Sequence, residues 1–505
     1  MMNKHLLKAG YGVAETGLTA SEVLIRLYLL IFYTDIVGLE PKLAGYAAAI
    51  AIVWDAVIDP LMGNISDRTR SRFGKRRPYI AIGSILLAGS LVFLFSPPHL
   101  ETQSGKFWFL LISYMLVNTA TTVIAIPHAA LGSELTPDRD EVTEIYAWRL
   151  ISGNLGAILG TIVPGIILTQ SSGATVAAGN APERSEAHAM AAAIVAIVII
   201  VTAITTFIVT RGADQPSNES GNADRQTGGQ GGKEGKVARS AAAAHLDGLR
   251  SLLRNKPFLT LFSAYLIATI GVNINSSFAF FYYKYRLNLT EADTQKIIAF
   301  FMVVFTLGLA GWIAVSNRFG KKIPLFAGTL GLGVMTATGY PLFSPGSMTG
   351  PAIAGILGGI FVGSILLLDA WLVDVVDYDE VKTRQNRPGL YFGIWKMGSK
   401  AARALAVAIS GILLSAIGFQ PNVTQTPEVS WNLALVFGPG VAFFFITGAI
   451  LSLNVRLDEA RVKKVRRILS RRTTRINPPS RRRVHKPHAH AGGLACRSIS
   501  RYARE

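Results

Sequence analysis

The sequence predicts an all-α membrane protein with twelve transmembrane helices in two six-helix halves. Half of the 505 residues are hydrophobic and only 16% are charged, and the mean hydropathy is +0.37. A bilayer core of about 30 Å needs about 20 apolar residues per helix, and runs of that length recur along the chain. The expected spans are residues 10–34, 42–64, 78–97, 106–128, 142–170, 189–210, 257–282, 294–316, 323–343, 351–373, 391–417 and 432–455.

The excess of positive charge has an uneven distribution. Of the net +19, residues Arg456 to Glu505 carry +13, because 16 Lys and Arg residues there stand against three acidic ones. The other basic residues lie mainly in short loops, and Asp67 to Arg77 alone hold six of them. This pattern suits the cytoplasmic face of a cell membrane better than a nucleic-acid-binding surface. With an even number of spans, we expect both termini in the cytoplasm and no nucleic-acid partner.

The chain divides into four parts. Residues 212–255 begin with a Gly-, Ser-, Asn- and Gln-rich stretch that predicts a flexible cytoplasmic linker. It separates an N-terminal half, 1–211, from a C-terminal half, 256–455. The loop SRFGKRRPY after the second span returns as NRFGKKIPL after the eighth, which indicates internal duplication. We expect the basic tail, 456–505, to be mostly disordered, with a short helix near 457–470 on anionic lipid headgroups.

Two aspartates lie within the second span. Asp55 and Asp59 are four residues apart, so their carboxylates share one helix face. Like charges inside a bilayer are costly and usually functional. We therefore expect the pair to be functional. The alternative is a structural pair neutralised by Arg149 or Lys400.

Four stretches carry a resemblance to one transporter family. They are YTDIVGL at 33–39, WDAVIDPLMGNISDRTRSRFGKRRPY at 54–79, IPHAALGSEL at 126–135 and DVVDYDEVKT…GLYFG at 374–393. In these stretches the chain resembles the glycoside–pentoside–hexuronide:cation symporters, the melibiose-permease family of the major facilitator superfamily. The resemblance implies the major facilitator fold, a solute site between the halves and cation-coupled symport by alternating access.

The resemblance also implies a cation site. The family counterparts of Asp55 and Asp59 are the cation-site carboxylates, and a threonine matching Thr122 contributes an oxygen. This chain has Ile58 where sodium-binding members have an amide. Because Na⁺ needs several oxygen ligands and a proton needs one carboxylate in a setting that disfavours its charge, we favour H⁺ over Na⁺. No cofactor besides the coupling ion is expected.

The residues that match the family's sugar site point to a different solute. Melibiose permease recognises sugar through two carboxylates and a tryptophan, and the matching positions here are Thr19, Ala125 and Ala129. Arg149 and Lys400 match basic residues of the family. Two cations without the sugar-binding acids would suit an anionic substrate, such as a hexuronide or another carboxylate.

Further candidates for the solute site lie on three other spans. Glu15 is one turn before Thr19 on the same face and could replace the missing carboxylate. His128 stands where the family usually has tyrosine, so it is a proton-relay, a substrate or a hydrogen-bonded packing residue. Asn273 and Asn275 form a polar patch in the seventh span and are expected to line the cavity.

Charged residues at the cytoplasmic ends of the spans are expected to act in gating. Basic residues of the loop after the second span set the topology and gate, and the acid beside them pairs with them or caps a helix. An acidic cluster ends the tenth span and should form ion pairs that lock one conformation. The candidates are Asp67, Arg68, Arg76, Arg77, Asp374 and Asp377.

The sequence thus predicts a monomeric, cation-coupled symporter of a small polar solute, either a sugar, a glycoside or a hexuronide-like anion, in contact with membrane lipids. An enzyme would need a nucleophile or metal constellation, which the sequence does not show. Two alternatives stay open. One is a lysolipid or amphiphile symporter of the same fold, and the other is a transport-silent membrane sensor whose basic tail binds a partner.

Overall fold

Helices account for all the regular secondary structure in the part of the chain that the structure describes. The computed structural model describes residues 4–136, 139–171, 181–211, 252, 254–385 and 387–476. Most of the predicted linker and the tail beyond residue 476 lie outside these residues. Twelve helices in the described part are long and apolar enough to cross a membrane, which confirms the predicted number of spans.

The N-terminal half supplies six spans. The first is interrupted once and ends in a π-helical turn, whereas the others are single helices. In order they are α1 (Lys4–Gly12), α2 (Ala14–Ile31) and η1 (Phe32–Ile36), then α3 (Pro41–Arg68), α4 (Arg77–Leu94), α5 (Gln103–Glu134), α6 (Arg139–Ser171) and α7 (Ala181–Val209).

The C-terminal half repeats this plan. Its first span also ends in a five-residue π-helical turn, at the same place as in the first half, which agrees with the predicted duplication. In order the elements are α9 (Lys256–Phe281) and η3 (Tyr282–Arg286), α10 (Glu291–Phe319), α11 (Lys322–Leu342), α12 (Thr349–Val362), η4 (Gly363–Leu366) and α13 (Leu367–Thr383), α14 (Pro388–Ala416), α15 (Pro427–Leu435), η5 (Val436–Gly440) and α16 (Val441–Leu453), followed by α17 (Glu459–Ile476).

Local sequence signals explain where several helices begin. Thr102, Asn255, Thr290 and Thr426 each precede a helix, and each side chain accepts a hydrogen bond from the backbone N–H three residues later. Such caps satisfy N–H groups that have no partner within the helix. Helices α3, α4, α9, α14 and α15 also carry proline in the first turn, where its missing N–H costs nothing.

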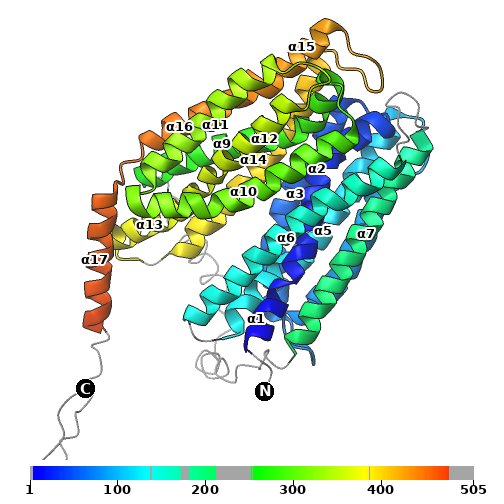
Figure 1. The fold of residues 1–505 in the computed structure, drawn as a ribbon. Coiled ribbons are helices and arrows are strands. Elements are labelled where there is room, and N and C mark those ends of the chain that lie inside the picture. Colours follow the sequence, from blue (N-terminus) through cyan, green and yellow to red (C-terminus); the bar gives the residue numbers. More distant parts are fainter. Residues whose placement is uncertain are drawn as a thin grey trace, which may run out of the picture.

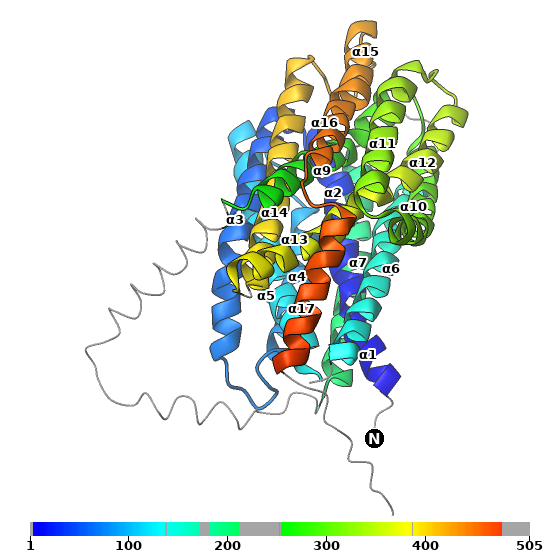
Figure 2. The ribbon, with the colours of Figure 1, turned by 90° about the vertical axis from the view of Figure 1, so that its left-hand side faces the viewer.

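The two halves meet at one end of the molecule and diverge toward the other (Figure 1). The 67–77 loop, Lys321, Lys322 and α17 lie at the diverging end, which we call the basic end. The opposite end carries η1, η3 and α15. Contacts between the halves join α3 to α14, α2 to α9 and α6 to α10. Helix α17 lies at the left edge of the molecule in Figure 1, and in the view turned by 90° it lies in front of the other helices (Figure 2).

The outer surface of the bundle is apolar, as a lipid-facing surface requires. Large hydrophobic side chains stay exposed along the helices, among them Ile85, Leu150, Leu307, Leu342 and Phe443. The first span, by contrast, is the most enclosed, with 78% of its most apolar window buried inside the protein. Its polar residues therefore face other helices and not lipid.

Candidate functional site

A cavity of about 450 Å³ lies between the halves, near the middle of the spans. Helices α2, α3, α5 and α6 line it from the N-terminal half, and α9 and α14 line it from the C-terminal half. Its charged and polar lining includes Glu15, Thr19, Glu22, Arg26, Asp55, Asp59, Thr122, Arg149, Asn273, Lys396, Lys400 and Arg403, with Ala125 among the apolar residues.

The acid pair of α3 is neutralised from the other half of the molecule. Lys400 Nζ on α14 lies 2.7 Å from Asp55 Oδ2 and 2.6 Å from Asp59 Oδ2. Thr122 Oγ1 on α5 lies 2.7 Å from Asp55 Oδ1 and 3.0 Å from Asp59 Oδ1. Because a hydroxyl has one proton, Thr122 donates to one carboxylate at a time. The cluster therefore joins the two halves through one ammonium group.

A second layer of charges surrounds this cluster. Arg403, one helical turn after Lys400, has Nη2 3.7 Å from Asp55 Oδ2 and Nη1 3.3 Å from Glu22 Oε1. Glu22 also accepts from Arg26, one turn along the same helix, at 2.7 Å. Lys400 and Arg403, one turn apart on the same face of α14, thus contact acids of both the first and the second span.

Arg149 is occupied elsewhere in the cavity. Its Nε donates to Glu15 Oε2 at 2.7 Å and its Nη2 donates to Glu15 Oε1 at 3.1 Å, a two-pronged pair between α6 and α2. Of the two candidate partners for the acid pair, the structure therefore selects Lys400. Glu15, which has no partner on its own helix, has one across the bundle.

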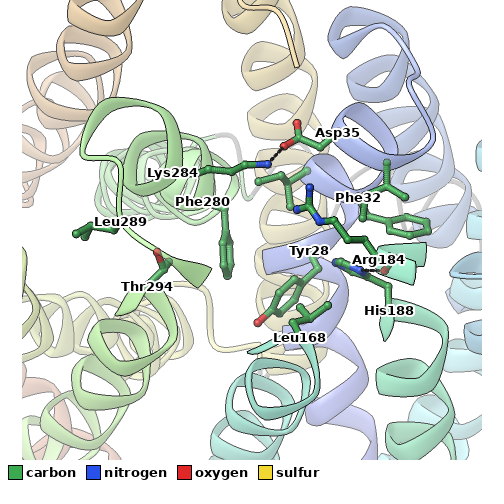
Figure 3. Close-up of a pocket in the computed structure, with 12 residues that line it drawn as sticks. Tyr28, Phe32, Asp35, Leu168, Arg184, His188, Phe280, Lys284, Leu289 and Thr294 are labelled. Atoms are coloured by element: carbon green, nitrogen blue, oxygen red, sulfur yellow. Dashed lines mark hydrogen bonds and ion pairs between the residues drawn. The ribbon is translucent and has the colours of Figure 1, made fainter. Parts of the chain in front are cut away.

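Beyond the cavity, an ion pair joins the two halves at the opposite end of the molecule, beside a separate small pocket. Asp35 in η1 is buried, and its Oδ2 lies 2.5 Å from Lys284 Nζ in η3 (Figure 3). Tyr285 OH donates to the same oxygen at 2.5 Å, and Asn422 Nδ2 donates to the Asp35 backbone carbonyl. These contacts join the matching π-helical turns of the two halves. π-Helical turns often mark functional positions.

Backbone contact reinforces this closure. A Cβ added at Gly411 on α14 would lie 2.4 Å from the Pro41 carbonyl oxygen and 3.0 Å from Gly45 Cα on α3. Only glycine allows the two helices to approach this closely. The halves are therefore tightly joined at the opposite end.

The ion pairs at the basic end brace each half separately. Arg76 donates to Asp67 at 2.5 Å, to Glu134 at 3.0 Å and to Ser66 Oγ at 2.6 Å. Burial disfavours its charge, but the hydrogen bonds to Asp67 and Glu134 outweigh burial and raise the pKa of Arg76. The guanidinium therefore stays charged at physiological pH.

The C-terminal half has a comparable cluster. Asp374 on α13 accepts from Lys321 at 2.5 Å and from Arg466 of α17 at 2.8 Å. The helix predicted near 457–470 is present as α17 and runs to Ile476. Because Asp374 pairs within its own half, it does not lock the two halves together in this conformation.

The comparisons with known proteins decide the family. Residues 10–459 match the family model described as MFS/sugar transport protein. The chain belongs to this family. The transporter is 26% identical to the isoprimeverose transporter of Lactiplantibacillus pentosus, with 88% of each chain covered. It is 24% identical to the sodium-dependent lysophosphatidylcholine symporter 1-A of Danio rerio, over 86% of this chain and 83% of that protein.

Solved structures agree on the fold. The transporter superposes on a D-xylose–proton symporter with a TM-score of 0.61 at 14% identity, covering 89% of this chain and 96% of that one. The family and the twelve apolar helices make the chain an integral, multi-pass membrane protein. Its family consists of transporters, not enzymes, and its symporter relatives imply a solute and a coupling cation as transported partners.

Not all of the predicted substrate residues line the cavity of the transporter. Thr19, Asn273, Arg149 and Lys400 line the cavity, as does Glu15. Asn275 is not among the lining residues, and its amide faces the Tyr340 hydroxyl inside the C-terminal half. Residues two apart on a helix point about 200° apart, so Asn273 and Asn275 cannot both face one cavity.

The remaining predicted residues lie outside the cavity. His128 is completely buried behind Glu15. Arg77 on α4 donates to the Phe207 carbonyl at 3.1 Å, which ties the loop after the second span to α7. Arg68 is exposed and Asp377 is half-buried at the basic end.

Sequence reasoning missed several residues that the structure brings to the site. Asp35 was part of a recognised stretch, but its partner Lys284 is 249 residues away. Lys396 and Arg403 sit one turn to either side of Lys400, a spacing that the sequence shows plainly. Among the described residues, no group of three or more His, Cys, Asp or Glu side chains is placed to hold a metal ion.

Proposed function

We propose that this transporter is a symporter that couples H⁺ to the movement of a small, polar, anionic solute by alternating access. The observation that carries the proposal is the bridge from Lys400 to Asp55 and Asp59 in the wall of a cavity formed by both halves. A cation that binds the acid pair changes the contact that joins the halves. Solute binding and ion binding are thereby linked through one group.

The charge of the cavity favours an anion. Four acids line it, at positions 15, 22, 55 and 59, against five bases, at positions 26, 149, 396, 400 and 403. The net charge is therefore +1 when all are ionised. Among the described side chains that line the cavity, Lys396 is the base that forms no ion pair with an acid. A proton on the acid pair would add a second positive charge, which an anionic solute would balance.

Protonation of the acid pair also makes the Lys400 ammonium available to the solute. With one carboxyl neutral, Lys400 keeps one carboxylate partner and can donate to a solute carboxylate beside Lys396. Breaking a buried ion pair without replacement costs about 3–5 kcal/mol. An anionic solute that binds together with the proton replaces the carboxylate that Lys400 has lost and so removes this cost. Each ligand therefore raises the affinity for the other.

An amphiphile symporter is the second candidate, since one relative is named as a lysophosphatidylcholine symporter. Such a solute needs apolar surface for its acyl chain. The cavity is instead lined by nine charged side chains. These charged side chains therefore favour a small anion over an amphiphile.

We also propose that the basic end faces the cytoplasm of the cell membrane, with both termini on that side. Lys and Arg in short loops favour the cytoplasmic side, and the 67–77 loop, Lys321 and α17 all lie at this end. The conformation then opens toward the cytoplasm. We expect the transporter to act as a monomer, because the cavity is completed within one chain.

The test is an uptake screen with the purified protein in proteoliposomes. Uronates, other small carboxylates, neutral glycosides and a lysolipid are offered under an imposed proton or sodium gradient. We expect a carboxylate to accumulate about tenfold per pH unit for each coupled proton. Asp59→Asn should abolish accumulation and keep exchange, while Asp293→Asn, which removes an acid at the opposite end, should change neither.

Two results would contradict the proposal. Accumulation of a neutral glycoside, with no accumulation of any carboxylate, would show that the substrate is not an anion. Normal gradient-driven accumulation by Asp59→Asn would remove the acid pair from the coupling mechanism.

A further inference from the structure

A buried histidine and a tyrosine hold each other behind the cavity. His128 Nε2 on α5 lies 2.9 Å from the backbone carbonyl oxygen of Tyr11. Tyr11 OH donates to the backbone carbonyl of His128 at 2.9 Å, and the two rings stack with centroids 4.5 Å apart. A carbonyl oxygen can only accept, so Nε2 of His128 must carry a hydrogen. In the neutral imidazole of His128, the hydrogen is therefore on Nε2 and not on Nδ1.

The other ring nitrogen then faces a second acceptor. His128 Nδ1 lies 3.4 Å from Glu15 Oε2 and has no hydrogen-bond partner. In a neutral ring with hydrogen on Nε2, Nδ1 presents a lone pair. A lone pair facing a carboxylate is repulsive, and a buried polar atom without a partner is costly. One proton between Nδ1 and Glu15 removes both penalties.

We propose that Glu15 and His128 form a second proton-binding site, distinct from Asp55 and Asp59, which holds one proton between the imidazole and the carboxylate. The ligand is a proton and no larger ion, because His128 is completely buried and Nε2 is already engaged.

The charged neighbours decide where the proton resides. Arg149 on α6 donates twice to Glu15 and so favours the carboxylate form. Tyr11 of α1 and Tyr146 of α6 face the site as neutral phenols whose hydroxyls donate to backbone carbonyls. Two further ion pairs, Lys8 with Glu144 at 2.6 Å and Arg26 with Glu22 at 2.7 Å, are each neutral as a whole. The proton therefore belongs on His128, as an imidazolium beside a carboxylate.

The site is built on a break in the first span. Helix α1 ends at Gly12 and α2 begins at Ala14. Thr206 of α7 occupies the break: its hydroxyl donates to the Gly10 carbonyl at 2.7 Å and accepts from the Ala14 N–H at 3.1 Å. The Thr206 hydroxyl also lies 3.4 Å from the Tyr11 carbonyl oxygen, which accepts the shorter hydrogen bond, of 2.9 Å, from His128. Discontinuous helices form ion sites in many transporters.

Protonation of this site has a consequence for the solute, and this consequence, unlike the site itself, rests on the proposed function. Glu15 is shared between the His128 imidazolium and Arg149. When His128 loses its proton, Glu15 binds Arg149 alone. Arg149 lines the cavity, so the protonated site leaves it more available to an anionic solute. Binding of the anion should therefore be weaker when His128 is neutral.

The experiment is a pH titration of ¹⁵N-histidine-labelled, full-length protein in lipid nanodiscs, followed by NMR. We expect His128 to be doubly protonated at pH 7, and to become singly protonated in Glu15→Gln, whose amide can donate to Nδ1. The His128→Gln variant assigns the signal. His188→Gln is the matched control, because His188 is also buried but its Nδ1 is satisfied by the Arg184 carbonyl at 2.7 Å.

The outcomes separate the two proposals. A singly protonated His128 at pH 7, or a titration that Glu15→Gln leaves unchanged, would overturn the second proton site. The wild-type titration and Glu15→Gln decide this even when His128→Gln does not fold. Because the measurement needs no solute, a failed uptake screen would overturn the proposed function and leave this result intact. With a transported anion in hand, Glu15→Gln should lose the pH dependence of its binding.

Discussion

Replacing Lys400 with methionine tests how strongly the acid pair holds the halves together. Methionine keeps the length and apolar stem of lysine but removes the ammonium that lies 2.7 Å from Asp55 and 2.6 Å from Asp59. Side-chain exposures of 14% for Lys400 and 7% for Asp55 mean little screening by solvent. Removing one partner of such a pair costs about 3–5 kcal/mol. Arg403, 3.7 Å from Asp55, offsets only part of this loss.

The pH dependence of the variant gives a sharper signature. Once the Lys400 ammonium is removed, the two carboxylates repel each other more strongly than Arg403 can offset, and a proton on one of them relieves the repulsion. A carboxyl that binds a proton more readily in the folded than in the unfolded state stabilises the protein at low pH, and this contribution is lost as pH rises. Lys400→Met should therefore gain stability relative to wild type from pH 8 to pH 5.

The assay is thermal unfolding in detergent at both pH values. The double variant Lys400→Met/Asp59→Asn should recover most of the stability lost at pH 8, because only one buried carboxylate remains. Lys296→Met, at an exposed surface pair, is the control and should have little effect. The reasoning is refuted if Lys400→Met unfolds like wild type at pH 8, or if adding Asp59→Asn destabilises it further.

Three further predictions concern the ends of the molecule. Asp35→Asn should loosen the opposite end and raise the labelling of a cysteine introduced there. The exchange Asp35→Lys/Lys284→Asp should restore closure. Equal labelling of the wild type, Asp35→Asn and the exchanged protein would exclude this gate. Gly411→Val should separate α3 from α14 and abolish uptake, while Gly89→Val, which meets nothing within 4 Å, should not. Deleting residues 457–505 should leave uptake intact, and loss of uptake in a folded truncation would favour the sensor alternative.

Much of the fold follows from chemistry that the sequence displays directly. Span-length apolar runs must form helices in lipid, because their backbone groups have no water to bind. The repeated loop of nine residues indicated two similar halves, and the matching π-helical turns at Phe32–Ile36 and Tyr282–Arg286 agree with it. The π-helical turns themselves leave no periodic signal, and the break at Gly12–Val13 lies within the first predicted span, 10–34. Packing against α7 determines that break.

The site was predictable in part. Spacing placed Asp55 and Asp59 on one face, and family resemblance added Thr122 and Lys400. Neither spacing nor resemblance could decide between Lys400 and Arg149 as the neutralising partner, because both lie on other helices and the choice depends on how the halves meet. The Asp35 pair was hidden for the same reason. The separation of Asn273 from Asn275 needed only helix periodicity and was available from the sequence.

The choice of coupling ion turns on the residue between the two aspartates. Lys400 Nζ already occupies the space that both Oδ2 atoms share, so a sodium ion must displace it from both acids. A proton neutralises one acid and leaves Lys400 on the other. Ile58 offers no oxygen to compensate for the larger displacement. We therefore expect Ile58→Asn, which adds an amide oxygen beside the pair, to give uptake that responds to a sodium gradient at equal pH on both sides. Wild-type protein should respond to the proton gradient alone, and a wild type driven by sodium would show that Lys400 yields its place at a far smaller cost than the geometry implies.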